Sequence, residues 1–135
     1  NYSDYKAIGG KGSPLWPHQK RPEQKIIKRL NMGFKKRSNQ IKELIPILNN
    51  SNFSRIICSD INDTPLSFAY HQFDKYFQDA FTISGNGTGG TYIGKVPGLR
   101  IDYIWHEKKF SSYNFKIHSE ELSDHRAIST SIIIP

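Results

Sequence analysis

The chain has 135 residues, 36% of them hydrophobic and 13% aromatic, which is enough apolar material for one buried core and predicts one domain or part of one. Its formal net charge of +7 indicates anionic partners such as nucleic acid, nucleotides or lipid headgroups, although a basic surface is often only solvated. The single cysteine excludes a scaffold of intrachain disulfides, and no stretch approaches the roughly 18 apolar residues of a membrane span. No signal peptide is visible either, so the sequence leaves the compartment unknown.

Residues 1–22 are rich in Gly, Pro and Lys, which predicts an irregular loop. The chain does not begin with Met, so a natural N-terminal segment is expected to precede it. From 23 to 49 the apolar residues recur at helical spacing and predict a helix with one apolar stripe, formed by Ile27, Leu30, Phe34, Ile41, Leu44, Ile45 and Leu48. The excess of Lys and Arg lies in this first part and is expected to form a solvated outer face, because no aromatic residues interleave with the charges.

Residues 50–135 are predicted to form strands, with a helix within 64–76. The expected strands are 55–59, 91–94, 99–106, 113–118 and 127–134. Short connections between successive strands favour antiparallel pairing, so the predicted fold class is α+β, a mainly antiparallel sheet with outer helices. Cys58 lies in an apolar run and is expected to be a small buried hydrophobe. The glycine-rich stretch 85–90 lacks the Lys-Ser/Thr ending of a phosphate-binding loop, which favours a flexible hairpin loop.

Three short acidic motifs lie where runs of β-forming residues meet polar turns. They read Ser-Asp-Ile-Asn-Asp at 59–63, Arg-Ile-Asp-Tyr-Ile at 100–104 and Ser-Asp-His at 123–125. Because functional side chains often lie where rigid strands end, three carboxylates, an amide and an imidazole can converge at one end of a sheet. This set of groups suits the cleavage of a phosphate ester.

The first motif offers a carboxylate and an amide two residues apart. Alternate residues of an extended chain point to the same side, so Asp60 and Asn62 can face one pocket. The carboxylate could then hold or deprotonate an attacking water, while the neutral amide donates to a phosphate oxygen. The alternative is a simple turn, since Asp and Asn are common turn residues.

Asp102 lies inside an otherwise apolar strand, and a buried carboxylate requires a partner. One alternative is a local ion pair with Arg100 on a solvated face. The other pairs Asp102 with His125, which would fix the imidazole tautomer and favour its charged form. This second arrangement predicts a carboxylate oxygen of Asp102 within about 3.2 Å of a ring nitrogen of His125. It leaves Asp124 free to bind a metal ion or its water.

Taken together and in this order, the three motifs resemble the last three motifs of the endonuclease/exonuclease/phosphatase superfamily, which commonly read Gly-Asp-Phe-Asn, Arg-Ile-Asp-Tyr and Ser-Asp-His. The intervening sequence looks most like bacterial members, and the resemblance covers about residues 23–135. It implies a metal-dependent phosphoesterase on a four-layer α/β/β/α sandwich. The chain 1–135 would then be a single partial domain, the C-terminal half of that sandwich.

The resemblance also implies a role for each motif residue. Asp60 would align or activate the attacking water, and Asn62 would contact the scissile phosphate. His125 would stabilise the charge that develops on the phosphate, and Asp102 would orient His125. Asp124, together with Asp60 and Asn62, would hold Mg2+ or Mn2+, which would act as Lewis acid and charge clamp.

Two departures from the family pattern shape the functional expectation. Ser59 stands where the family usually has Gly, and the family's opening strands, with an Asn and a metal-binding Glu, would precede residue 1. We therefore expect hydrolysis to require the missing N-terminal half, and the exposed sheet face to associate with that half or with itself. The alternative is a non-catalytic basic module that binds an anion or nucleic acid. Nucleic acids, sphingomyelin and inositol phosphates are all substrates of the superfamily, so the phosphate ester stays unspecified.

Overall fold

The structure, a computed structural model, describes residues 22–135, and side chains from residue 31 onward. Residues 32–135 form one compact unit. The loop expected over 1–22 lies outside the described residues, except for Pro22, which begins the first helix. No helix in the described part of the chain is long and apolar enough to cross a membrane. The elements in chain order are α1 (Pro22–Asn49), β1 (Ile56–Asp60), α2 (Phe68–Tyr76), β2 (Phe77–Asp79), α3 (Ala80–Ser84), β3 (Asp102–Glu107), β4 (Ser111–Ile117) and β5 (Ile128–Ile133).

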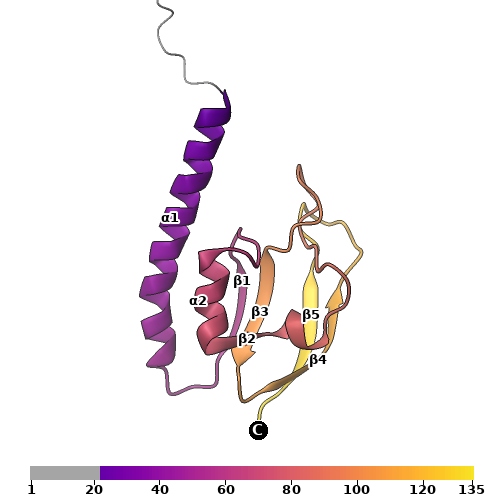
Figure 1. Ribbon diagram of the computed structural model, residues 1–135. Helices are drawn as coiled ribbons and strands as arrows, with labels where there is room; N and C mark the ends of the chain where they lie inside the picture. The colour runs from indigo at the N-terminus through magenta and orange to yellow at the C-terminus, as the bar shows by residue number, and fades with distance from the viewer. Residues whose placement is uncertain (1–21) are drawn as a thin grey trace, which may run out of the picture. The chain divides into compact units, whose positions relative to one another are not determined.

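Two antiparallel sheets carry the fold. The first has the strand order β1-β3-β2, and the second is the β4-β5 pair. Figure 1 shows α2 and the C-terminal part of α1 on one side of the three-stranded sheet, with β4 and β5 on its other side. The predicted α+β class with antiparallel sheets is therefore confirmed.

Strand β3 lies between two apolar layers, because its side chains alternate between the two faces of the sheet. Tyr103 and Trp105 pack against the helices, whereas Ile104 packs toward β4 and β5. The helix-side cluster consists of Ile41, Ile45, Ile61, Ala69, Tyr70, Phe73, Phe77, Tyr103 and Trp105. Burying each large apolar side chain contributes about 1.5–3 kcal/mol, so these two layers hold β3 at the centre of the fold.

The helical stripe is narrower than the sequence predicts. Ile41, Ile45 and Leu48, at spacings of four and three residues, pack on the helix-side core. Phe34 and Leu44 were expected on the same stripe but are exposed, at 45% and 37%. Helix α1 thus joins the core through its last two turns.

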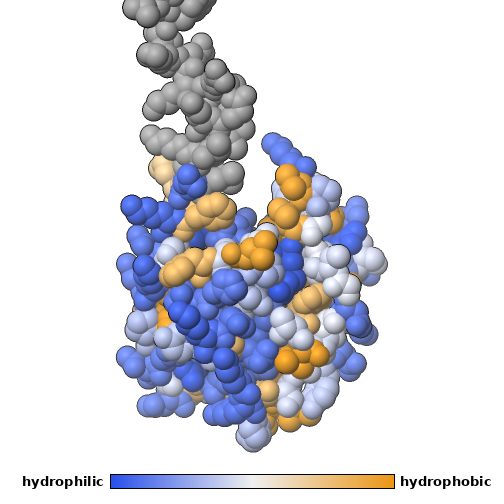
Figure 2. Space-filling model, viewed as in Figure 1, coloured by the Kyte–Doolittle hydropathy of each residue, from blue (hydrophilic) through white to orange (hydrophobic). Residues whose placement is uncertain are grey.

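Strand β1 is covered on one face only, and this corrects the prediction for Cys58. Ile57 packs on the helix-side core, while Ile56, Cys58 and Asp60 point to the other face and are exposed. An apolar run gives no sign of which face of an edge strand will be covered, so the expectation of a buried thiol was wrong. On the face that Figure 2 shows, hydrophilic residues predominate and hydrophobic ones form separate small groups.

The chain between α3 and β3 also differs from the expected pair of strands. In place of a strand at 91–94, Tyr92 makes isolated pairings with Leu99 and with His125. The stretch 85–90 has no regular structure, in agreement with the predicted loop. Strand β2 and helix α3 lie in the stretch between the predicted 64–76 helix and the strand expected at 91–94, where the sequence analysis had placed no element.

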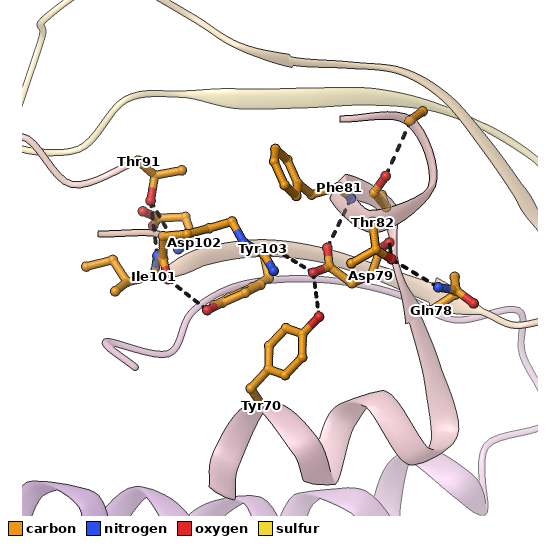
Figure 3. Close-up of polar contacts among 12 residues, drawn as sticks. Tyr70, Gln78, Asp79, Phe81, Thr82, Thr91, Ile101, Asp102 and Tyr103 are labelled. Carbon is orange, nitrogen blue, oxygen red and sulfur yellow. Dashed lines mark hydrogen bonds and ion pairs between the residues drawn. The ribbon is translucent and has the colours of Figure 1, made fainter. Parts of the chain in front are cut away.

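A buried ion pair fixes the start of β3. The carboxylate of Asp79, which is 0% exposed, accepts hydrogen bonds from the guanidinium of Arg100, the hydroxyl of Tyr70 and the backbone N–H of Phe81. Figure 3 shows the hydroxyl of Tyr70 pointing toward Asp79. The alternative that paired Arg100 with Asp102 is therefore wrong. Burial together with the charge of Asp79 raises the pKa of Tyr70 to about 12, so its hydroxyl stays a donor.

The guanidinium of Arg100 is also surrounded by aromatic rings. It lies 4.7 Å from the ring centre of Phe81 and 4.8 Å from that of Tyr103. The hydroxyl of Tyr103 lies 2.8 Å from the backbone oxygens of Asp63 and Arg100. Tyr103 thereby links the segment after β1 to the segment before β3.

Arg100→Leu should lower the free energy of unfolding by about 3–5 kcal/mol, because it leaves the buried carboxylate of Asp79 without its counter-charge. The matched control is Lys109→Leu, which removes the cation of an ion pair whose lysine side chain is 63% exposed and should cost about 1 kcal/mol or less. Urea unfolding followed by tryptophan fluorescence measures both. Equal losses in the two variants would contradict the importance of the Arg100–Asp79 pair.

Candidate active site

Two acidic motifs meet because of the register between β1 and β3. Strand β1 ends at Asp60, β3 begins at Asp102, and the two residues are direct Cα partners in the antiparallel ladder. Directly opposed residues of such a ladder project to the same face. Two carboxylates side by side repel each other, so the pair requires a cation or a hydrogen-bond donor nearby.

His125 supplies that donor. Its Nδ1 lies 2.9 Å from Oδ2 of Asp102, which is the contact that the sequence predicts. Because Nδ1–H donates to the carboxylate, Nε2 is the ring nitrogen left to face a ligand. Ligand atoms of Asp60, Asp102 and His125 all lie within 4.8 Å of one another. We call these three residues the Asp–Asp–His cluster.

Backbone contacts position the imidazole. The Oγ of Ser123 accepts the backbone N–H of His125 at 2.9 Å, and Arg126 donates its N–H to the carbonyl of Thr91 at 2.8 Å. The ring of Tyr92 meets the ring of His125 edge to face, with centres 5.3 Å apart. The segment around Thr91 and Tyr92 therefore holds the Ser-Asp-His motif against the sheet.

Thr91 holds the other side of the cluster as well. Its Oγ1 accepts the backbone N–H groups of Ile101 and Asp102, both at 3.3 Å, and these contacts appear in Figure 3. Neither Thr91 nor Tyr92 was predicted from the sequence to have a role. The one available signal was the short connection between the strands expected at 91–94 and 99–106, because two strands joined in this way pair with each other.

The environment of His125 favours its charged form. The hydrogen bond to Asp102 raises the pKa of His125 above its ordinary value, partial burial opposes this, and the charges of Asp102, Asp60 and Asp124 add to the increase. An imidazolium at this position offsets the repulsion between the two carboxylates. It also presents a positive charge to any anion that enters beside Asp60.

Asn62 lies beside Asp60, as the sequence predicts. A turn brings it there, however, and not the alternation of side chains along a strand. The chain turns after β1, and Asn62 adopts a left-handed backbone with φ of 49°, which Asn tolerates better than most residues. Its backbone N–H donates to Oδ1 of Asp60 at 2.9 Å, and its side-chain amide donates to Oδ2 at 3.0 Å. Asn62 thus fixes the orientation of the Asp60 carboxylate.

Asp124 is a predicted metal ligand that the structure leaves outside the Asp–Asp–His cluster. It is exposed, and its backbone carbonyl accepts the N–H of Ile93 at 2.9 Å. Of the metal ligands expected from the sequence, the structure therefore joins Asp60 and Asn62, while the second carboxylate of the cluster is that of Asp102. Oxygen atoms dominate this set, which suits Mg2+ or Mn2+, and water would have to complete the coordination.

A cleft of about 690 Å³ opens beside the cluster. Its walls combine polar site residues with apolar residues from β1, β3 and β5, among them Cys58, Ile104 and Ile128. The cluster therefore lies at the rim of a partly apolar cleft, where a bound group would be partly shielded from water.

Comparisons with known proteins show the fold. No protein-family model and no curated protein matches the sequence. Two solved structures resemble the chain. A conserved protein of unknown function from Enterococcus faecalis has a TM-score of 0.63 and 15% identity, over 74% of this chain and 45% of that one. A mannosyl-6-phosphatase from Bacteroides thetaiotaomicron has a TM-score of 0.53 and 17% identity, over 72% of this chain and 44% of that one.

The chain thus spans 45% and 44% of the length of these two solved structures. One of the two is a phosphatase, and at 17% identity the likeness concerns the fold.

The raised pKa of His125 predicts how stability changes with pH in the metal-free protein. A group whose pKa is higher in the folded than in the unfolded state stabilises the fold fully below its unfolded value, about 6.5. This contribution is lost as the pH rises through the folded-state pKa. Asp102→Asn keeps an oxygen near Nδ1 but removes the charge, so it should lower the pKa of His125.

NMR titration of the His125 ring protons in the presence of EDTA measures this pKa directly. Asp74→Asn, which changes an exposed carboxylate on α2, is the matched control and should leave the titration unchanged. An unchanged pKa in Asp102→Asn would mean that the contact with Asp102 does not set the charge of His125.

Proposed function

We propose that this chain carries part of the active site of a metal-dependent phosphoesterase of the endonuclease/exonuclease/phosphatase type. The observation that carries the proposal is the hydrogen bond between Asp102 and His125, 2.9 Å long, directly beside Asp60. The order of the three motifs supports the proposal, and so does the phosphatase among the similar folds. The substrate would be a phosphodiester or a phosphomonoester.

In the proposed reaction, each residue acts through the contacts described above. Asp60, oriented by both donors of Asn62, would align a water for in-line attack on phosphorus and take its proton. The side-chain N–H of Asn62, which donates to Asp60 in this structure, would donate to a phosphate oxygen instead when a phosphate lies beside Asp60. Hydrogen-bond donors near the attacked phosphate matter because they stabilise the charge that develops in the transition state.

His125 would supply most of that stabilisation. Its Nδ1–H is held by Asp102, so the ring is fixed and Nε2 can donate to a non-bridging phosphate oxygen. The raised pKa of His125 keeps this donor protonated over a wider pH range. The partly apolar cleft beside it would strengthen the contact by excluding water.

Asp60 and Asn62 would hold Mg2+ or Mn2+, and Asp124 stays a proposed third ligand through a water. The bound ion would supply Lewis-acid polarisation of the phosphate. The described residues provide few protein ligands for a cation that takes six oxygens. This shortage is the observation that favours the second candidate, a basic module that binds an anion or nucleic acid without hydrolysing it.

His125→Ala and Asp60→Asn should each lower turnover by the full-length protein at least about a hundredfold, since losing one such charge-stabilising contact costs about 2.7 kcal/mol or more. The assay is a panel of phosphodiesters and phosphomonoesters with and without Mg2+. The matched controls are His71→Ala and Asp74→Asn, which change exposed residues on α2 and should keep normal rates.

Turnover that stays near normal in His125→Ala would contradict its role. A wild-type protein that binds the substrates but hydrolyses none of them, with or without Mg2+, would favour the binding module.

The chain of 135 residues by itself should show weak Mg2+ binding and no metal-dependent hydrolysis. It should also associate with itself or with an added N-terminal half, because Ile56 and Cys58 leave one face of β1 uncovered. Calorimetry with Mg2+, a phosphodiesterase assay and sedimentation velocity test these expectations together. A monomer with efficient turnover would show that the site is complete without further residues.

A further inference from the structure

A second cleft, of about 350 Å³, lies on the other side of Asp60, between α1 and the first motif. Its α1 wall is formed by residues at positions 33, 36, 37 and 40, a spacing that places them on one face of the helix. The opposite wall comes from the turn after β1. The lining residues are Gly33, Lys36, Arg37, Gln40, Ile41, Asp60, Ile61 and Asn62. We call this space the α1 cleft.

The position of the helix wall is fixed by an ion pair. Arg37 Nη2 donates to Oδ1 of Asp63 at 2.8 Å, and the side chain of Asp63 is only 3% exposed. The charge of Arg37 is therefore neutralised by a buried carboxylate within the same motif as Asp60. Its Nε is buried and has no hydrogen-bond partner among the described residues.

The helix wall of the α1 cleft carries the group that can meet an anion, the ammonium of Lys36. Once Arg37 and Asp63 cancel, Lys36 contributes one positive charge on this wall and Gln40 contributes an amide donor, while the carboxylate of Asp60 on the opposite wall is held by both donors of Asn62. Asp60 is the one acidic residue among those that line the cleft, and it also lines the cleft beside His125. A ligand that reaches from one cleft into the other therefore passes Asp60.

We infer that the α1 cleft binds a second phosphate group of the substrate, with Lys36 as its main contact and Gln40 as an additional donor. This inference rests on the proposed function, because it places the reacting phosphate at the Asp–Asp–His cluster. A lysine ammonium binds phosphate as a point charge, and amide groups add direction. The preferred substrate class is then one with two phosphates near each other, in a nucleic-acid strand or in a bisphosphorylated small molecule.

The test compares Lys36→Ala with Lys35→Ala in the full-length protein. Both substitutions remove one lysine from an exposed part of α1, but Lys35 does not line the cleft. The substrates are an oligothymidylate and an inositol bisphosphate, each with two or more phosphates, and p-nitrophenyl phosphate, with one. Lys36→Ala should raise KM about tenfold for the multiply phosphorylated substrate that the enzyme uses, because a charge-assisted contact contributes about 1.5 kcal/mol or more.

KM for p-nitrophenyl phosphate should stay within about twofold in both variants, and Lys35→Ala should resemble the wild type throughout. For the oligothymidylate, Lys36→Ala should also reduce the slope of log K against log salt by about one unit. The substrate arm that shows the effect identifies nucleic acid or small molecule as the source of the second phosphate. Equal behaviour of the two variants would overturn the assignment.

A binding measurement separates this inference from the proposed function. Fluorescence anisotropy of a labelled oligothymidylate, and competition by inositol bisphosphate, are measured in EDTA so that no turnover is needed. If the wild type hydrolyses nothing but Lys36→Ala weakens binding and Lys35→Ala does not, the phosphate site stands and the enzymatic proposal fails. If neither ligand binds the wild type, or both variants bind equally well, the phosphate site is overturned.

Discussion

The buried ion pair between Arg100 and Asp79 is the interaction on which the geometry of the site depends. Asp79 ends β2 and opens α3, and Arg100 lies two residues before Asp102. Since the side chain of Asp79 is 0% exposed and that of Arg100 is 8% exposed, neither charge can be left without the other. The pair therefore fixes where β3 begins, and with it the register that places Asp102 opposite Asp60.

That register has a local cost. Two carboxylates on adjacent strands repel each other, and a protein selected for stability alone would avoid such a pair. The cost is reduced because Asp102 accepts a hydrogen bond from His125, and Asp60 accepts two from Asn62. Each carboxylate thus has donors of its own. A site that stores repulsion in this way is well suited to bind a cation or to orient a polar ligand.

The sequence predicted the contact between Asp102 and His125 because both lie in motifs with a recognisable order, and because a carboxylate in an apolar strand needs a partner. It could not predict that Asp79 would pair with Arg100, because 21 residues separate them and only the β2–β3 ladder brings them together. Cys58 was placed wrongly for a related reason: an apolar run shows that one face is covered, but not which one. Phe34 was placed wrongly as well, since helical periodicity does not reveal how far along α1 the core extends.

Strand β1 carries both a residue of the proposed active site and the uncovered apolar surface. Asp60 is the last residue of β1, and it shares its face of the strand with Cys58 and Ile56. On the proposed function, a segment that covered these apolar side chains would also lie beside Asp60 and narrow the cleft near His125. Removing water there would strengthen each charged contact to a bound phosphate, because Coulomb interactions grow as the local dielectric falls. The same segment would then cover the sheet and complete the active site. A protein in which this face of β1 is uncovered would therefore bind the phosphate weakly.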